Sequence, residues 1–312
     1  MNDRTDQHPG DTAQRLCVKT RINVNAWLHV LPRHDDQELH ELESLFLSVA
    51  TGDQLRFDAS PSVCADLNLT SNRPELIPHN SVQQAWTAFT NAVESVRDRC
   101  TLSISAYLEK RIPEKTGLGA GSGDAGATLL ALNQLHGFPF SHDQLAALAT
   151  SLGSDVPFFV ESGPCIVSGA GEIVDPIPPF PPLWCCIALP AFGVDTRRAY
   201  AALDDAINHR GVSEIEPTTG LSLVMESLRT RTQLQASETA RLNSFEATLG
   251  ENTASFLTIR NTLLAAGAIL AGLSGSGSAI FGIYAERAAA AAAALDVQRR
   301  ISVARALVAE IV

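Results

Sequence analysis

A glycine-rich segment that runs into a helical pattern is the part of this sequence best suited to binding phosphate. Every second residue from Gly117 to Gly123 is glycine, and helical apolar spacing begins at Ala125. Glycine permits the backbone conformations in which several N–H groups converge on one anion. A helix N-terminus adds partial positive charge. We therefore predict a polyphosphate site whose contacts are Gly117, Leu118, Gly119, Ala120, Gly121, Ser122, Gly123 and Asp124.

Two side chains near this segment could take part in phosphate chemistry. The Ser122 hydroxyl could reach a phosphate or Mg²⁺, and Asp155 places a carboxylate directly before the apolar run Val156 to Val160. Phosphoryl transfer needs a group that handles the proton of the attacking hydroxyl, which a carboxylate can do. An aspartate in a turn is also a common local cap, and a glycine-rich loop alone can be purely structural. The segment is not a Walker A loop, because no Gly-Lys-Ser/Thr closes it.

The elements that must position these residues alternate without strict βαβ regularity. We predict strands at 21–30, 54–58, 102–108, 156–160, 183–189 and 280–284. We predict helices at 81–99, at 125–135 with Asp124 as its N-cap, at 141–152, within 222–249 and from 285 onward. A Pro-rich stretch at 175–182 suggests a domain boundary. The predicted parts are a disordered tail at 1–14, an N-terminal domain at 15–175 and a C-terminal domain at 176–312.

Composition excludes several classes of protein. The 312 residues carry a net charge of -11, which disfavours nucleic acid as a partner. No run reaches the ~18 apolar residues of a membrane span, so no membrane association is expected. The N-terminus lacks the apolar core of a signal peptide, and we expect a cytoplasmic protein.

Three segments, in order, resemble the motifs of the GHMP kinase superfamily. Residues 112–126 (IPEKTGLGAGSGDAG) are similar to its P-x-x-x-G-L-G-G-G-S-S-N-A-A motif. Residues 152–159 (LGSDVPFF) are similar to L-G-A-D-V-P-F-F, and residues 273–279 (LSGSGSA) to its third motif. The resemblance implies an α+β fold of two domains, with an N-terminal domain like ribosomal protein S5 domain 2 and a ferredoxin-like C-terminal domain. It also implies ATP with Mg²⁺, a small-molecule alcohol as acceptor, and a monomer or homodimer.

The resemblance also implies roles for single residues. Asp155 corresponds to the catalytic base, while Asn23 stands where the superfamily usually has a catalytic lysine. Arg21, on the same strand face, is a candidate replacement for that lysine. Asn80 and Lys110 match adenine contacts. Asp124 replaces an asparagine and would either recruit Mg²⁺ or repel ATP.

The similarity is greatest to the branch of the superfamily that phosphorylates the 2-hydroxyl of 4-diphosphocytidyl-2-C-methyl-D-erythritol. In that branch a Tyr-His pair holds cytosine, and Leu39 replaces the tyrosine here. The substrate contacts implied by the match are Asn25, His40, Thr196, Tyr200 and Gly275. Two alternatives stay open: a GHMP kinase for another alcohol such as homoserine, mevalonate or a sugar, and a catalytically silent nucleotide-binding paralogue.

Overall fold

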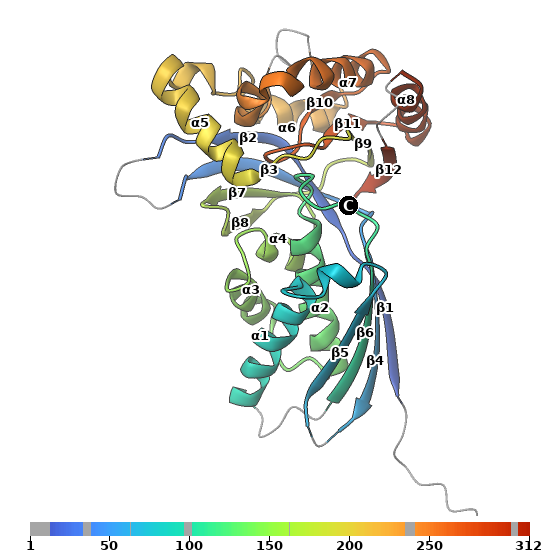
Figure 1. The fold of residues 1–312 in the computed structure, drawn as a ribbon. Coiled ribbons are helices and arrows are strands. Elements are labelled where there is room, and N and C mark those ends of the chain that lie inside the picture. Colours follow the sequence, from blue (N-terminus) through green and yellow to red (C-terminus); the bar gives the residue numbers. More distant parts are fainter. Residues whose placement is uncertain are drawn as a thin grey trace, which may run out of the picture.

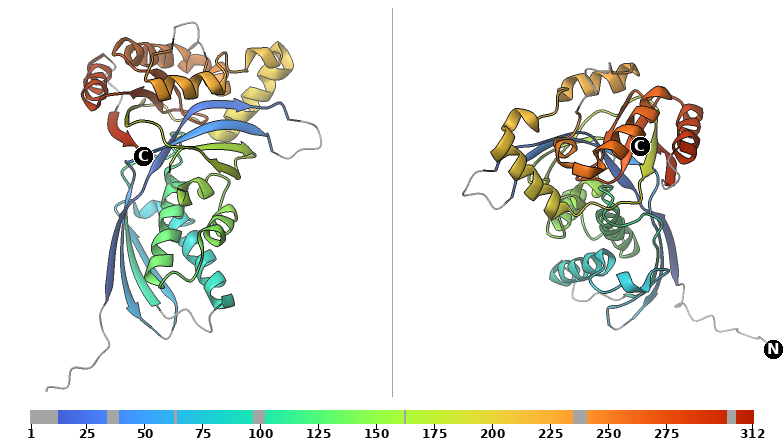
Figure 2. Two further views of the ribbon diagram at one scale, coloured as in Figure 1. Left: turned by 180° about the vertical axis from the view of Figure 1, so that it is seen from behind. Right: turned by 45° about the horizontal axis from the view of Figure 1, so that its top comes forward.

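The computed structural model describes residues 13–33, 39–62, 64–96, 102–161, 163–234, 241–300 and 305–312. A small sheet packs against one group of helices, and a large sheet carries a second group on its other side (Figure 1). The same two tiers are seen from behind and from above (Figure 2). Helices and sheets are both extensive, which confirms the predicted α+β class.

The small sheet has four strands in the order β1-β4-β6-β5. Its pairs are antiparallel except for β5 with β6. Alternating residues of β4 are buried, so one face of this sheet packs on the helices and the other meets solvent. The strands are β1 (Gln14–Lys19), β4 (Gln54–Pro61), β5 (Asp66–Ser71) and β6 (Leu102–Glu109), and the helices are α1 (Ser81–Val96), α2 (Ala120–Leu135), α3 (His142–Thr150) and α4 (Val156–Val160).

The large sheet has the order β10-β11-β9-β12-β3-β7-β8, with β2 paired to β3. Helices α5 to α8 cover the face turned away from α4 (Figure 1). The strands are β2 (Ile22–Val30), β3 (Leu42–Val49), β7 (Cys165–Gly169), β8 (Ile173–Pro176), β9 (Leu183–Leu189), β10 (Leu270–Leu273), β11 (Ile280–Tyr284) and β12 (Arg305–Ile311). The helices are α5 (Thr196–Arg210), α6 (Leu221–Thr230), α7 (Thr253–Ala265) and α8 (Arg287–Arg300).

The large sheet joins the two sequence halves that the Pro-rich stretch separates. β3, β7 and β8 precede that stretch and β9 to β12 follow it, yet all belong to one sheet. β12 lies between β9 and β3, so the C-terminal strand completes the sheet. The division at residue 176 stays a prediction, and residues 1–12 of the proposed tail lie outside the described residues, with Gln14 already in β1.

Three local predictions are wrong. Residues 156–160 form helix α4 and not a strand, with Pro157 in its first turn, where proline is tolerated. Helix α2 begins at Ala120 after Gly119, so Asp124 lies inside the helix and is not its N-cap. The alternation of residues 21–30 predicts a half-buried strand with one polar face, but β2 is buried on both faces, because the large sheet has helices on one side and α4 on the other. The short apolar run at 156–160 could not separate helix from strand by periodicity.

Candidate active site

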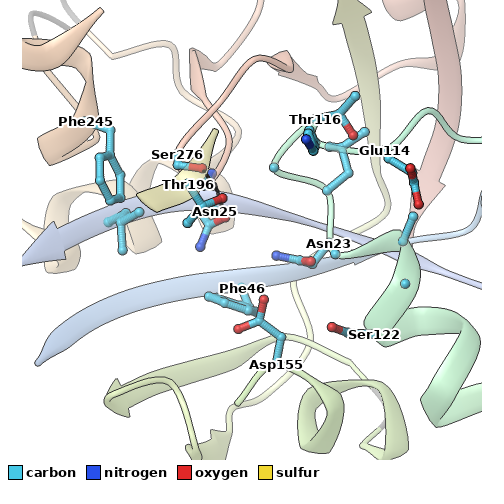
Figure 3. A pocket seen from close by; sticks show the side chains of 18 of the residues that line it. Asn23, Asn25, Phe46, Glu114, Thr116, Ser122, Asp155, Thr196, Phe245 and Ser276 are labelled. Carbon is cyan, nitrogen blue, oxygen red and sulfur yellow. Dashed lines mark hydrogen bonds between the residues drawn. The ribbon is translucent and has the colours of Figure 1, made fainter. Parts of the chain in front are cut away.

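A cavity of about 490 Å³ opens where the two tiers of the molecule meet. It is bounded by β2, the segment 113–119, the start of α2, Asp155, the start of α5 and the turn at 275–276 (Figure 3). Of the predicted phosphate contacts, Gly117 to Ser122 line it, whereas Gly123 and Asp124 do not. We call this the main cavity.

Two glycines of the 117–123 segment are required by the geometry of the chain. Gly117 and Gly119 have φ values of 73° and 60°, which side chains rarely adopt. A Cβ at Gly117 would lie 2.2 Å from the Ser274 carbonyl oxygen, and one at Gly119 would lie 2.2 Å from Asn23 Oδ1. A Cβ at Gly121 would meet nothing within 4 Å. The backbone at Gly117 and Gly119 is therefore packed closely against the rest of the protein, whereas Gly121 leaves open space at the start of α2.

The turn at 274–277 is tied to this segment and to β2. The Ser274 hydroxyl donates to the Gly117 carbonyl at 2.8 Å, and the Gly275 N–H donates to Asn25 Oδ1 at 2.9 Å. Asn25 Nδ2 in turn donates to Ser44 Oγ at 3.0 Å. The predicted substrate residues Asn25 and Gly275 both line the cavity, but the Asn25 amide is already engaged in holding the turn.

Asp155 presents a carboxylate to the main cavity. It immediately precedes α4, and its carboxylate points toward β2, with the Ser122 hydroxyl on the same side of the cavity (Figure 3). Burial raises the pKa of Asp155, and a hydrogen bond with Ser154 lowers it by less. A carboxylate of raised pKa is a stronger base than one in water.

Asn23 faces Asp155 from β2 (Figure 3). It is buried, and its Oδ1 has no hydrogen-bond partner within the described residues. Arg21, the candidate replacement for the missing lysine, has an exposed side chain and does not line the cavity. The lysines that do line it are Lys110 and Lys115. No substitute cation from β2 therefore lies beside Asp155.

Lys110 belongs to a buried network at the base of α2. Its Nζ lies 2.5 Å from Asp53 Oδ2 and 2.9 Å from Asp124 Oδ2. Asp53 Oδ1 also accepts from the N–H of Ile112 at 2.9 Å. Burial and the charge of Asp53 raise the pKa of Asp124 to about 7, although Lys110 opposes this. Asp124 thus pairs with Lys110, and neither predicted alternative, Mg²⁺ recruitment or ATP repulsion, is needed to place it.

An aromatic group lies at one end of the cavity. The rings of His40 and Tyr200 are 4.9 Å apart, and Tyr200 meets Phe245 edge-on at 5.0 Å. His40 Nε2 lies 2.8 Å from Asp204 Oδ1, and the Thr196 hydroxyl bonds to Ser276 Oγ at 3.1 Å. A neighbouring cavity of about 530 Å³ contains His40 and Asp204 and shares Asp155, Thr196 and Tyr200 with the main cavity. The two cavities are therefore neighbours with shared walls, and the glycine segment lines one and His40 the other.

Comparison with known proteins identifies the family. The GHMP kinases N terminal domain model matches residues 80–163 and the GHMP kinases C terminal model matches 224–302. A 4-diphosphocytidyl-2-C-methyl-D-erythritol kinase of Rhizobium johnstonii is 34% identical over 96% of this chain and 95% of its own length. The chain belongs to the GHMP kinase family. This GHMP kinase is also 31% identical to the Symbiobacterium thermophilum protein of that name, over 87% of this chain and 92% of that protein.

Solved structures agree with this assignment. A crystal structure of 4-(cytidine 5'-diphospho)-2C-methyl-D-erythritol kinase superposes with a TM-score of 0.75 at 28% identity, covering 95% of this chain and 99% of its own. A homoserine kinase from Cytophaga hutchinsonii, at 18% identity and a TM-score of 0.67, shares the fold over 99% and 97% of the two chains. The protein is thus a small-molecule kinase, and its family implies the use of ATP. Among the described helices, none is long and apolar enough to cross a bilayer.

One predicted nucleotide contact of this GHMP kinase lies outside the main cavity. Asn80 Oδ1 accepts from the Val82 N–H at 2.9 Å, and its Nδ2 donates to the Leu76 carbonyl at 3.2 Å. It therefore caps the start of α1 and lines a separate cavity of about 610 Å³ with Ser151 and Leu152. Its contact with adenine stays a prediction, as does that of Lys110.

Sequence reasoning missed several residues of the site. Glu114, Lys115, Phe245 and Ser276 line the main cavity, and Asp204 holds His40. Glu114, Lys115 and Ser276 lie within recognised motifs and could have been included on position alone. Phe245 and Asp204 lie between the motifs, where no local pattern marks them.

Proposed function

We propose that this GHMP kinase transfers the γ-phosphoryl group of ATP to the 2-hydroxyl of 4-diphosphocytidyl-2-C-methyl-D-erythritol. The observation that carries the proposal is the position of Asp155, between the glycine segment and the pocket of His40 and Tyr200. Relatives that cover nearly the whole chain bear the name of this kinase. A nucleotide and a cytidine diphosphate would then meet at Asp155 from opposite ends of the site.

The residues around the glycine segment fit a nucleotide triphosphate and Mg²⁺. Gly121 leaves open space where the sixteen-residue helix α2 begins, and the positive end of its dipole favours phosphate there. Mg²⁺ is usually held by one or two carboxylates together with substrate phosphates. Glu114 and Asp155 are the carboxylates that line the described cavity, and Ser122 lines it as well. ATP with Mg²⁺ supplies the transferable phosphoryl group and neutralises its charge.

Asp155 would accept the proton of the acceptor hydroxyl. A base must lie within hydrogen-bond reach of that proton and have a suitable pKa, which burial provides by raising the pKa of this carboxyl. Asn23 would offer its amide to the same region, as a neutral group and not as a charge. Catalysis would thus depend on the positioning of the reactants and on the basicity of the Asp155 carboxylate.

The base of the cytidine would stack on the aromatic group. The His40 and Tyr200 rings contact each other at 4.9 Å, so a base lies against one face of the pair and not between the rings. A single stacking platform of this kind contributes about 1–3 kcal/mol to binding. Arg33 and Arg197 at the same cavity provide positive charge for the diphosphate.

A coupled ADP-release assay against 4-diphosphocytidyl-2-C-methyl-D-erythritol, homoserine, mevalonate and sugars tests the proposal. We expect turnover with the first substrate, and a loss of about 10²–10⁴-fold in kcat in Asp155→Asn, the range for removing a general base. Asp175→Asn, an exposed aspartate in β8, is the matched control and should keep wild-type activity. Full activity of Asp155→Asn would refute the mechanism.

The same assay also tests the two alternative functions, each of which is supported by one observation. Leu39 is 66% exposed where the resembled branch has a tyrosine, which favours a different alcohol if only another member of the panel is turned over. Asn23 in place of a lysine favours a silent nucleotide-binding paralogue if ATP binds without turnover of any substrate.

A further inference from the structure

A second polar cavity of about 340 Å³ lies in the C-terminal half, and none of its residues lines the main cavity. It is formed where the end of α5, the residues around η3 (Ser244–Thr248) and the first two turns of α7 come together. We call it the arginine cavity. No step of the phosphoryl transfer described above uses it.

Positive charge dominates the walls of the arginine cavity. Arg210 ends α5, Arg241 precedes η3, and Arg260 lies two turns into α7. Glu246 is the one acidic residue among the lining residues. Among the residues that line the cavity, there are thus three guanidinium groups and one carboxylate. Guanidinium groups bind the oxygens of phosphate through paired N–H donors, and they keep their charge at any physiological pH.

The arginine cavity also contains a buried acidic side chain, that of Glu246. Its side chain is only 4% exposed, and neither carboxylate oxygen has a hydrogen-bond partner of normal geometry among the described residues, although the backbones of Leu273 and Leu242 lie close enough to lower its pKa. Arg260 Nη1 lies 3.6 Å from Glu246 Oε2, which is ion-pair range but not a hydrogen bond. Burial raises the pKa of Glu246 to about 8, although Arg260 lowers it. A buried acid held by one ion pair and by no hydrogen bond of normal geometry is costly, and a protonated acid can donate to a bound oxyanion.

The N-terminus of α7 adds to the positive electrostatic potential of the arginine cavity. Thr253, the first residue of this thirteen-residue helix, lines the arginine cavity. The 3-10 turn η4 (Gly250–Asn252) leads directly into the helix, and the Thr253 N–H donates to the Gly250 carbonyl. The partial positive charge at a helix N-terminus favours anions. Phe256 and Leu257 complete the wall with apolar surface.

We propose that the arginine cavity is a second anion-binding site, which takes a phosphate or diphosphate group between Arg210, Arg241 and Arg260. Arg241 and Arg260 make other contacts as well, and the proposal depends on their charge and position. The ligand is small, because the cavity is smaller than the main cavity. Phe245, the residue before Glu246 in η3, lines the main cavity, so a ligand here would bind directly behind the active site.

Isothermal titration of the full-length protein with inorganic diphosphate, and separately with inorganic phosphate, at constant ionic strength tests this site. We expect saturable binding of at least one anion. Arg210→Gln and Arg241→Gln should each weaken it about tenfold, the value of one charge-assisted hydrogen bond. Arg210 is exposed, so its replacement should not impair folding. Arg299→Gln removes the same charge from an exposed position on α8 that does not line the cavity, and should bind as the wild type does.

A further variant shows which of the two cavities binds the anion. The glycine segment could also bind it, so Ser122→Ala serves as a reporter for the main cavity. If Ser122→Ala weakens binding and the two arginine variants do not, the anion lies in the main cavity and the proposal is wrong. Absence of saturable binding would also overturn it. Slower amide hydrogen exchange in peptides covering 241–260 on titration would support the site without reference to enzyme activity.

Discussion

Among single residues, Asp204 is the one whose contact orients His40, which we propose to bind the cytidine base. Its carboxylate lies 2.8 Å from His40 Nε2, and His40 is buried against Tyr200. An Nε2–H donated to Asp204 leaves Nδ1 as an acceptor for an exocyclic amino group. Neither residue lies among those we assign to the phosphoryl transfer itself.

We predict that Asp204→Asn raises KM for the cytidine substrate about tenfold and leaves kcat within about twofold, because one oriented hydrogen bond is worth about 1.4 kcal/mol or somewhat more. Steady-state kinetics of ADP release measure both constants. Asp205→Asn, the exposed neighbour on α5, is the control. An equal fall in kcat for Asp204→Asn would show that the pair acts in the chemical step instead.

A second residue-scale prediction concerns the missing cation near Asp155. Asn23→Lys would place an ammonium group beside a carboxylate whose pKa burial raises. An opposite charge within ~4–6 Å lowers an aspartate pKa by about 1–3 units. The acid limb of the kcat/KM profile should therefore move to lower pH by about one unit or more.

A pH–rate series from pH 4 to 9 measures this shift. Asn68→Lys adds the same charge at an exposed position of β5 and should leave the profile unchanged. An unshifted acid limb in Asn23→Lys would mean that Asp155 is not the group that titrates in the profile.

The sequence predicted some of these residues for sound physical reasons and missed others. Gly117 and Gly119 were predicted because a tight anion-binding turn needs positive φ, and both have it. The role of Asn25 in holding Gly275 depends on two residues 250 positions apart, and no local pattern encodes such a contact. Asp204 was missed for the same reason, since its partner His40 lies 164 positions away.

At the scale of elements, the Lys110–Asp124 contact fastens the start of α2 to the end of β6. Asp124 lies in the second turn of α2, Lys110 follows β6, and Asp53 precedes β4. Three elements therefore meet at one ammonium group directly beneath the glycine segment. The orientation of α2, and with it the positive end of its dipole, depends on this buried network.

The raised pKa of Asp124 predicts a pH dependence of stability. The folded carboxyl has a pKa of about 7 and its ordinary value is 3.8, so the folded protein binds more protons than the unfolded chain between these values. This contribution is fully present below pH 3.8 and is lost as pH rises through 7. From pH 5 to pH 8, the wild type should lose about 1–3 kcal/mol relative to Asp124→Asn, which does not titrate.

Urea unfolding of the two proteins at pH 5, 6, 7 and 8 measures the difference. Asp58→Asn is the control, because Asp58 is an exposed strand residue paired with Arg15. A constant difference between wild type and Asp124→Asn across this range would show that Lys110 keeps Asp124 ionised throughout.

Helices and strands were predicted correctly where the hydrophobic periodicity extended over many residues, and incorrectly where the apolar run was short. A helix was predicted at 141–152, and α3 begins there, with a capping box formed by Ser141 and Gln144. The five apolar residues of α4 fit a buried strand equally well, and only their packing between α2 and the large sheet decides for a helix. The early start of α2 was missed because glycines at helix positions have low propensity, and here α2 tolerates Gly121 and Gly123.

At the scale of the whole molecule, one strand connects the two sequence halves. β12 pairs with β9 along its length and reaches β3 at Ile311, while the Val312 N–H donates to the Ser48 carbonyl. The main cavity lies between parts contributed by both halves, so its shape depends on this connection. A sheet joined through its middle should unfold as one unit.

Ala309 allows a direct test of that cooperativity. It is buried in β12 opposite Cys185, so Ala309→Asp puts a carboxylate into the core of the large sheet. We predict a loss of about 2–5 kcal/mol in the free energy of unfolding, since an unpaired buried charge is costly. Glu310→Asp, the exposed neighbour, places an aspartate in the same strand without burial and should cost far less.

The decisive measurement is which strands lose protection from hydrogen exchange when the protein is destabilised. Urea unfolding followed by hydrogen exchange should show β4 and β6 of the small sheet losing protection at the same denaturant concentration as β9 and β11. Both regions should shift together in Ala309→Asp, because β12 lies between β9 and β3 and no other strand of the described residues joins these two strands. If only β9 and β11 lose protection while the small sheet stays folded, the halves are independent folding units, as the Pro-rich stretch at 175–182 predicts.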